Sequence, residues 1–138
     1  MTLSVEFLDE LKRRRDAIMA GGGLDKIEQR HARGTMSARE RLDALFQEAT
    51  FQEIGTHARH GARFFGMEAK DLPADGVVVG TGYVGGRLVA AFSQDFTVAA
   101  GTVGKMHAKK IVSVMDAAVK LGAPVVAFKD SGGARIQE

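Results

Sequence analysis

The chain has 138 residues, 45% of them hydrophobic and 26% charged, a composition that predicts about one globular domain with a buried core. Nineteen basic residues against seventeen acidic ones leave a net charge of +2, which argues against nucleic-acid and membrane-surface partners. Cysteine is absent, so disulfides and thiol chemistry are excluded. The sequence shows no signal-peptide pattern and no long apolar run, so we expect a cytoplasmic protein without membrane insertion.

Helices are predicted for most of the first third of the chain. Residues 4–20 carry apolar residues at helical offsets, and the basic cluster Lys12–Arg15 within them fits a solvated face better than a phosphate site. A second helix is expected at about residues 24–33, where Ile27 is the only large interior apolar residue. We therefore place that helix on a surface or against a partner chain. A third helix is predicted at residues 37–47.

The start of the third helix has a recognisable cap. Ser37 and Glu40 have the spacing of a capping box, in which each side chain accepts a hydrogen bond from the other residue's backbone N–H. Arg39 and Arg41 lie in the first turn, the unfavourable end of the helix dipole for a cation. An anionic ligand would compensate them, and so would an ion pair with Glu40 or Asp43. Both interpretations stay open.

A small sheet is predicted in the middle of the chain. Residues 51–54 read as a short strand, and residues 76–83 and 87–93 as a hairpin closed by a glycine-containing turn. Gly80 and Gly82 inside the first hairpin strand indicate either a bulge or a close approach of another backbone.

The histidines are weak candidates for chemistry. His57 and His60 lie in a basic and aromatic loop without a third ligand at a suitable offset, so no metal site is predicted. His107 is a possible general base, but nothing pairs with it nearby in sequence. A structural hydrogen bond on a helix surface is the favoured interpretation for His107.

A crossover is predicted in the last third of the chain. After a glycine-punctuated loop at residues 94–104, a long helix that stops at Gly122 is predicted. Its apolar face consists of Met106, Ile111, Val114, Met115, Ala118 and Leu121. Residues 124–128 form a short, buried strand that we expect to lie parallel to one hairpin strand. The layout predicts an α/β fold with helices packed on a sheet.

The residues after this strand are the main candidate site. Residues 130–134 contain two glycines, which allow a tight turn with exposed N–H groups, and residues 135–138 suit the start of a helix. Such donors can stabilise a phosphate, a carboxylate or the negative oxygen of an enolate or tetrahedral intermediate. A turn that merely connects two elements is the alternative, and the residues alone do not select the anion.

Six blocks of this sequence, in order, resemble a known family. They are MSARERL (36–42), FGM (65–67), DGV (75–77), FSQDFT (92–97), MHAK (106–109) and DSGGARIQE (130–138). They are similar to the N-terminal part of the carboxyltransferase (beta) subunit of biotin-dependent acyl-CoA carboxylases, of the propionyl-CoA carboxylase beta and methylmalonyl-CoA decarboxylase alpha type. One departure is Thr35, where the family usually has a lysine, which puts the grip on the CoA phosphates in doubt.

The resemblance implies a crotonase-like (ClpP/crotonase) fold, of which this chain would hold part of the N-terminal domain preceded by short helices. Residues 1–50 would then be a helical segment and residues 51–138 the first part of a truncated acyl-CoA carboxyltransferase domain. The resemblance also implies a dimer-based homo-oligomer, hexameric at full length. A biotin carboxylase and biotin carrier subunit would be the partners.

The resemblance implies carboxyl transfer from carboxybiotin, supplied by a partner carrier domain, to a short-chain acyl-CoA such as propionyl-CoA, without a metal. The backbone amides of Gly133 and Ala134 would hold the thioester enolate, with Gly132, Arg39 and Arg135 contacting the CoA thioester. Decarboxylation of a methylmalonyl-CoA type substrate is one alternative. For this stretch alone, a non-catalytic CoA-binding or assembly module, inactive by itself, is another.

Overall fold

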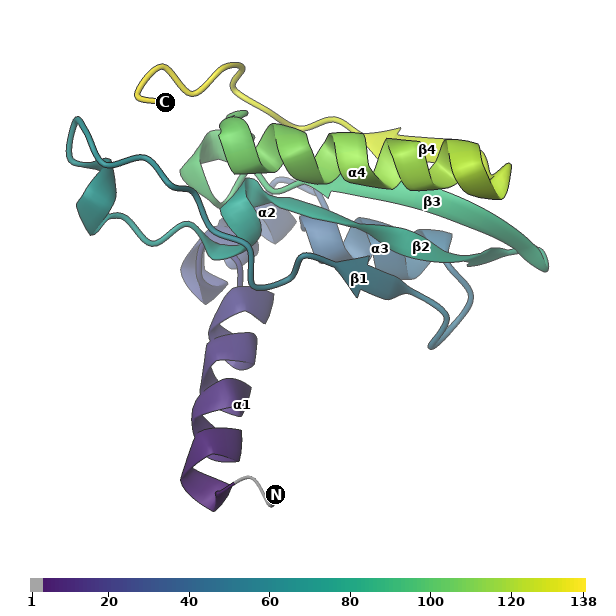
Figure 1. The fold of residues 1–138 in the computed structure, drawn as a ribbon, viewed down its shortest axis with the longest axis horizontal. Helices are drawn as coiled ribbons and strands as arrows, with labels where there is room; N and C mark the ends of the chain where they lie inside the picture. Colours follow the sequence, from purple (N-terminus) through teal and green to yellow (C-terminus); the bar gives the residue numbers. More distant parts are fainter. Residues whose placement is uncertain (1–3) are drawn as a thin grey trace.

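The computed structural model describes residues 4–138 and shows a four-stranded sheet with helices packed on both faces, from which α1 projects like an arm (Figure 1). The helices and strands are α1 (Val5–Met19), α2 (Leu24–Ala32), α3 (Ala38–Leu45), β1 (Gln52–Ile54), β2 (Val77–Val84), β3 (Arg87–Gln94), α4 (Lys105–Leu121) and β4 (Val125–Phe128). Short 3-10 turns lie between them: η1 (Met67–Ala69), η2 (Pro73–Gly76) and η3 (Ala99–Gly101).

The strands are ordered β1-β2-β3-β4. β1 and β3 pair antiparallel with β2, whereas β4 pairs parallel with β3, so α4 is the crossover between the two parallel strands. The predicted short strand, hairpin, long helix and parallel crossover are all confirmed. The prediction that this last strand is buried is wrong: β4 is exposed or half-buried along its length, because its second edge and part of its face have no covering element in the described residues.

Two apolar clusters hold the helices to the sheet, one on each face. Alternate residues of β2 point to opposite sides, as expected for a strand. Val78 packs with Leu42 and Phe46 from the α3 side, whereas Val77 and Val79 pack with residues of α4. The members on the α4 side are Val77, Val79, Ala90, Phe92, Val114 and Ala118.

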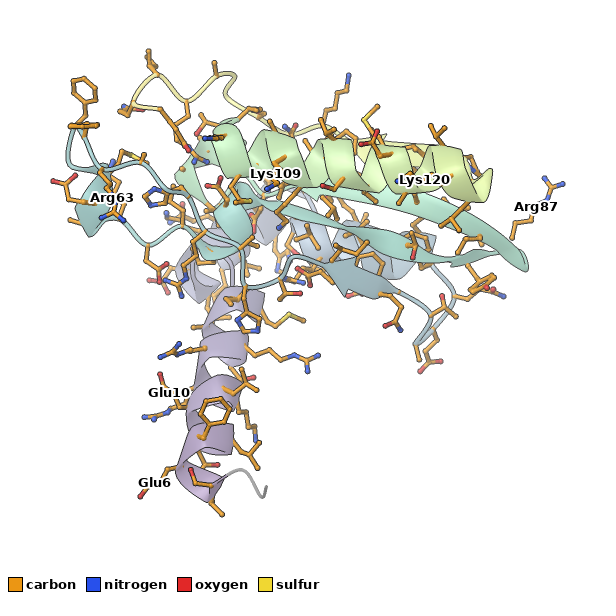
Figure 2. The ribbon with its side chains drawn as sticks, viewed as in Figure 1. Glu6, Glu10, Arg63, Arg87, Lys109 and Lys120 are labelled. Carbon is orange, nitrogen blue, oxygen red and sulfur yellow. The ribbon has the colours of Figure 1, made fainter. Side chains whose placement is uncertain are left out.

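The helix ends follow the sequence closely. The capping box of α3 is present, with the Ser37 N–H 2.6 Å from the Glu40 carboxylate and the Glu40 N–H 3.3 Å from the Ser37 hydroxyl. Hydrogen bonds from His31 and then from the Ser37 backbone lower the pKa of Glu40 to about 2. On α1, Arg13 and Arg14 both pair with Glu10, which agrees with a solvated face, and Glu6 and Glu10 project from the arm (Figure 2).

Gly80 and Gly82 mark close approaches and not a bulge, since the β2–β3 register is continuous. A Cβ atom on Gly80 would lie 2.2 Å from the Gln52 carbonyl oxygen, and one on Gly82 would lie 2.6 Å from the Phe46 ring. The absence of side chains at these positions therefore lets β1 and α3 pack against β2.

Gly80→Ala is expected to lower the free energy of unfolding by about 1–3 kcal/mol, because the new methyl group meets a backbone oxygen that cannot move without disturbing the β1–β2 pairing. Gly61→Ala is the matched control, since a Cβ there would meet nothing within 4 Å. Urea unfolding measures both variants. Equal stability of the two would contradict the close-packing interpretation.

The end of the chain differs from the prediction. Residues 135–138 form one turn, closed by a 3.2 Å hydrogen bond from the Glu138 N–H to the Arg135 carbonyl, and not a helix. Across residues 4–138, the helices are all too short or too polar to cross a bilayer.

Candidate functional site

Two loops carry backbone N–H groups without acceptors. The first is η3, where Ala99, Ala100 and Gly101 have φ angles of 46°, 53° and 62°. This left-handed turn is closed by a 2.9 Å bond from the Gly101 N–H to the Val98 carbonyl. The N–H groups of Ala99 and Ala100 are bonded to no acceptor in residues 4–138. Fixed, unpaired N–H groups of this kind suit an anionic ligand.

The second loop, residues 130–135, is called the amide loop here. Backbone hydrogen bonds join it to η3 and to Val103: Gly132 N–H to Ala100 O (2.8 Å), Val103 N–H to Gly133 O (2.8 Å) and Arg135 N–H to Val103 O (3.0 Å). The last two form a parallel bridge around Ala134. In such a bridge the central residue turns its own N–H and C=O to the other side. The Ala134 N–H accordingly bonds to nothing in the described chain.

The predicted donors thus differ in how they are used. Ala134 has a free N–H within the described residues. The Gly133 N–H donates only to the hydroxyl of Ser131, at 3.0 Å, and this bond is local and exposed to solvent, so a ligand could take the place of the hydroxyl. Gly132 is committed to Ala100 and has a structural role. Gly133 has a φ of 108°, which explains why the second glycine is needed. Direct contact of Gly132, Gly133 and Ala134 with a ligand stays a prediction.

Asp130 anchors the start of the amide loop. Its carboxylate accepts from Arg30 of α2 and, at 2.7 Å, from Arg41 of α3. Its N–H lies 3.1 Å from the side-chain oxygen of Gln94 at the end of β3. Arg30 also lies over the ring of Phe96, 5.6 Å from its centre. The first-turn cation Arg41 is therefore compensated by an anion of the amide loop.

Arg135 anchors the other end of the amide loop. It is 5% exposed, and its guanidinium group lies 2.6 Å from Asp75, 2.9 Å from Glu138 and 2.9 Å from the Thr102 carbonyl. Asp75 itself is fully buried in η2, with a φ of 49°. All of these donors are used inside the protein, so the geometry of Arg135 is that of a group that positions the loop. Its contact with CoA stays a prediction.

Asp75 also caps α4. Its second carboxylate oxygen accepts the His107 N–H at 2.8 Å, and its carbonyl lies 2.9 Å from Nδ1 of His107. His107 is fully buried, so the prediction that it lies on a helix surface is wrong, although the expected structural hydrogen bond is present. Burial, as the main cause, lowers the pKa of His107. Lys110 is buried on the same face, donates to the carbonyls of Ala74 and Val77, and has its pKa lowered to about 8 by burial.

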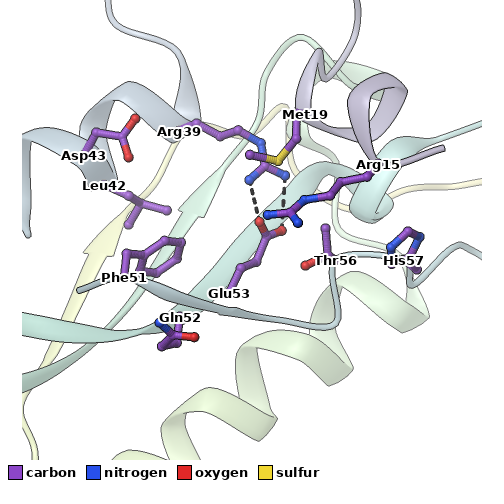
Figure 3. Close-up of a pocket in the computed structure, with 10 residues that line it drawn as sticks. All are labelled: Arg15, Met19, Arg39, Leu42, Asp43, Phe51, Gln52, Glu53, Thr56 and His57. Carbon is purple, nitrogen blue, oxygen red and sulfur yellow. Dashed lines mark hydrogen bonds and ion pairs between the residues drawn. The ribbon is translucent and has the colours of Figure 1, made fainter. Parts of the chain in front are cut away.

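Arg39 lies elsewhere, at a pocket of about 470 Å³ between α1, α3 and β1 (Figure 3). Its guanidinium group makes two hydrogen bonds with Glu53, and Arg15 points into the same pocket. The ion-pair interpretation of Arg39 is thus supported, with Glu53 in place of the expected Glu40 or Asp43. Contact of Arg39 with a cofactor stays a prediction.

The structure adds a basic pocket that sequence reasoning missed. This pocket has a volume of about 260 Å³ and lies between α2 and η3. It is lined by Lys26, Gln29, Arg30, Arg33, Phe96, Thr97, Ala99 and Ala100. No acidic side chain lines it. The signal in the sequence is the spacing of Lys26, Arg30 and Arg33, which places three cations on one helix face.

Another pocket, of about 240 Å³, also includes Ala99 of η3 in its lining. It is lined by Met67, Lys70, Leu72, Ala99, Thr102, Arg135 and Gln137. The unpaired amides of η3 thus lie beside a basic pocket and a partly apolar one. His57 and His60 line other pockets, and residues 4–138 hold no group of three metal-ligating side chains.

Comparisons with known proteins agree on one family. Residues 29–138 match the model of the carboxyl transferase domain. The chain is 52% identical, over 138 residues, to methylmalonyl-CoA decarboxylase subunit alpha of Propionigenium modestum, covering 100% of this chain and 27% of that protein. It is 47% identical to the propionyl-CoA carboxylase beta chain of Cereibacter sphaeroides, covering 96% and 26%.

A solved structure supports the same family. The crystal structure of transcarboxylase 12S with methylmalonyl-coenzyme A and methylmalonic acid bound, described as a hexamer assembly, matches with a TM-score of 0.95 and 43% identity. The match covers 100% of this chain and 27% of that one. The chain therefore spans about a quarter of the length of these relatives.

Proposed function

Because the chain belongs to the carboxyl transferase domain family and has its crotonase-like fold, we propose that the protein transfers a carboxyl group from carboxybiotin to a short-chain acyl-CoA such as propionyl-CoA. The observation that carries the proposal is the pairing of η3 with the amide loop, which gathers the unpaired N–H groups of Ala99, Ala100 and Ala134 in one region.

Carboxyl transfer requires these N–H donors when the enolate of the acyl-CoA forms. When the α-proton of the acyl-CoA leaves, negative charge moves onto the thioester oxygen, and donors fixed beforehand stabilise that charge without reorganising. Each such donor is worth on the order of 3 kcal/mol of transition-state stabilisation. Carboxybiotin would supply the carbon dioxide and, once decarboxylated, a base for the α-proton, while the donors of this chain would hold the thioester oxygen as the enolate carbon bonds to the carbon dioxide. Gly133 contributes its amide once its local bond to Ser131 is replaced.

The basic pocket is the proposed site for the CoA phosphates. Lys26 lies 3.1 Å from the Thr97 carbonyl and Arg30 is paired with Asp130, whereas Arg33 forms no ion pair in the described part of the chain. A phosphate bound there would meet cations of α2 close to the amides of η3. This placement compensates for the threonine at position 35, whose hydroxyl donates to the Arg30 carbonyl at 2.9 Å.

The remaining parts of the enzyme are proposed by analogy with the relatives. We place residues 1–50 in an N-terminal helical segment and residues 51–138 in the first part of the acyl-CoA domain. A biotin carboxylase and carrier subunit would supply carboxybiotin, and the assembly would be a dimer-based hexamer in the cytoplasm. The hexamer assembly of transcarboxylase 12S supports the oligomer.

The test is an assay of the complete protein encoded by the reading frame that contains these residues. Supplied with carboxybiotin and propionyl-CoA, it is expected to form methylmalonyl-CoA, detected by mass spectrometry. Formation of no carboxylated product with any of acetyl-, propionyl- or butyryl-CoA would overturn the proposal.

Decarboxylation is a second candidate, favoured by the 52% identity to methylmalonyl-CoA decarboxylase subunit alpha. The same enolate forms when methylmalonyl-CoA loses its carboxyl group, so the same donors serve both directions. Incubation of the complete protein with methylmalonyl-CoA and the free biotin carrier tests this direction: loss of methylmalonyl-CoA with formation of propionyl-CoA is expected, and no loss would overturn the candidate. For this stretch alone, a CoA-binding or assembly module is the third candidate, and calorimetric binding of acetyl-CoA without turnover would support it.

A further inference from the structure

A chain of hydrogen bonds runs beneath the amide loop and joins four elements. The N–H of Asp130, at the start of the loop, lies 3.1 Å from Oε1 of Gln94 at the end of β3. The Gln94 side-chain nitrogen lies 3.1 Å from Nε2 of His107 in α4. Nδ1 of His107 lies 2.9 Å from the carbonyl of Asp75 in η2. Gln94 and His107 are both buried, at 7% and 0% exposed.

The two ends of this series of hydrogen bonds determine which group donates and which accepts at each link. A backbone N–H only donates and a backbone carbonyl only accepts, so Gln94 presents its oxygen to Asp130 and its NH₂ group to His107. Nε2 of His107 must then accept, and Nδ1 must carry the proton that is donated to the Asp75 carbonyl. Only the neutral Nδ1–H tautomer satisfies every link.

We propose that Gln94 and His107 are positioning residues that hold Asp130, and with it the donors of the amide loop, and that with glutamine at position 94 this arrangement requires a neutral His107 with its proton on Nδ1. The catalytic part of the proposal rests on the function proposed above. Protonation of Nε2 would place two donors face to face, between His107 and Gln94 or, after rotation of the Gln94 amide, between Gln94 and Asp130.

The surroundings of His107 favour its neutral form. The charged groups near it are Asp75 from η2, Arg135 from the amide loop and Lys110 from α4 itself, which are two cations and one anion. Burial comes first among the causes that lower the pKa of His107 below its ordinary value of 6.5. The unfolded chain therefore binds a proton near pH 6.5 that the folded chain does not, so stability is full above that pH and declines as the pH falls below it.

Gln94→Glu is the decisive variant. A carboxylate accepts from both sides, so it keeps the link to the Asp130 N–H but requires a proton on Nε2 of His107. In ¹⁵N NMR spectra of the chain at pH 7, wild-type His107 is expected to show a protonated Nδ1 and an unprotonated Nε2. In Gln94→Glu both nitrogens should be protonated. Gln47→Glu, the same chemical change at an exposed position, should leave the His107 signals unchanged.

Activity of the complete protein gives the second readout. Gln94→Leu removes both links, and kcat for carboxyl transfer should fall by roughly 10- to 100-fold with little change in KM, because the donors lose their fixed geometry. Gln94→Glu should keep kcat within a few fold of wild type, since Asp130 retains its acceptor.

A wild-type Nε2–H tautomer, a charged wild-type His107 at pH 7, or unchanged His107 signals in Gln94→Glu would contradict the proposed hydrogen-bond chain. These spectra require no turnover, so they test the hydrogen-bond chain even if the proposed function fails. Expected spectra together with equal activity of Gln94→Leu and wild type would refute the positioning role alone.

Discussion

Asp75→Ala is expected to lower the free energy of unfolding by about 3–5 kcal/mol, because it removes the fully buried anion beside the Arg135 guanidinium and leaves only Glu138 to compensate that charge. The two charges are 2.6 Å apart, and their side chains are 0% and 2% exposed. The substitution also removes the carboxylate that accepts the His107 N–H at the start of α4. In addition, it places alanine at a φ of 49°, a left-handed conformation that alanine disfavours. Urea unfolding of the chain at pH 7 measures the loss.

Three further variants separate charge from geometry. Asp75→Asn keeps an acceptor and tolerates the left-handed backbone, so it should cost less than alanine. Asp75→Ala combined with Arg135→Met should recover part of the loss, since the guanidinium that Asp75→Ala leaves undercompensated is then gone. Asp71→Ala breaks the exposed pair with Arg59 and should change stability by no more than about 1 kcal/mol. If Asp75→Ala proves as mild as Asp71→Ala, the buried pair has no structural role.

Local signals made most of the fold predictable. The capping box at Ser37 and Glu40, the glycine turn of the hairpin and the Gly122 stop each depend on residues within a few positions of one another. The parallel β3–β4 pairing followed because a helix between two strands returns the chain in the same direction. The amide loop was found for the same reason, since its glycines directly follow a strand.

The rest of the site depends on contacts between distant residues. Asp75 and Arg135 are 60 positions apart, and neither shows by its neighbours that it is buried. On α4, apolar periodicity predicted Met115 and Leu121 on the packed face, yet they are 46% and 59% exposed. His107 and Lys110 face inward instead. Polar residues can occupy that face only because η2 and the start of β2 supply acceptors, which no local pattern of α4 reveals.

The turn η3 was expected only as a glycine-punctuated loop. Alanine normally avoids positive φ, so two alanines in left-handed conformation are not predicted by propensity. Tertiary contacts hold them there, because Ala100 accepts from Gly132 and a Cβ on Gly101 would lie 2.2 Å from the Asp130 carbonyl. Strained backbone of this kind is typical of functional sites. We therefore include η3 beside the amide loop in the proposed site.

Replacing the Ala134 amide with an ester is expected to reduce kcat for carboxyl transfer by roughly 10²–10³-fold, the usual effect of removing one donor to a developing oxyanion. Lactic acid in place of Ala134 removes the N–H and keeps the side chain. The Ala134 N–H takes part in no hydrogen bond of the described chain, whereas its neighbours Gly133 and Arg135 make the bridge to Val103. The fold should therefore persist, and KM should change little because the donor acts mainly on the transition state.

An ester at Ile136 is the matched control, since its side chain is 92% exposed and its position lies beyond the bridge to Val103. Full activity is expected there, with circular dichroism and melting temperature unchanged in both esters. A tenfold or smaller difference in kcat between the two esters would show that Ala134 is not a donor to the enolate. The catalytic role would then pass to the amides of η3. The same replacement at Ala100 tests that role directly, because the Ala100 N–H is also unpaired within residues 4–138.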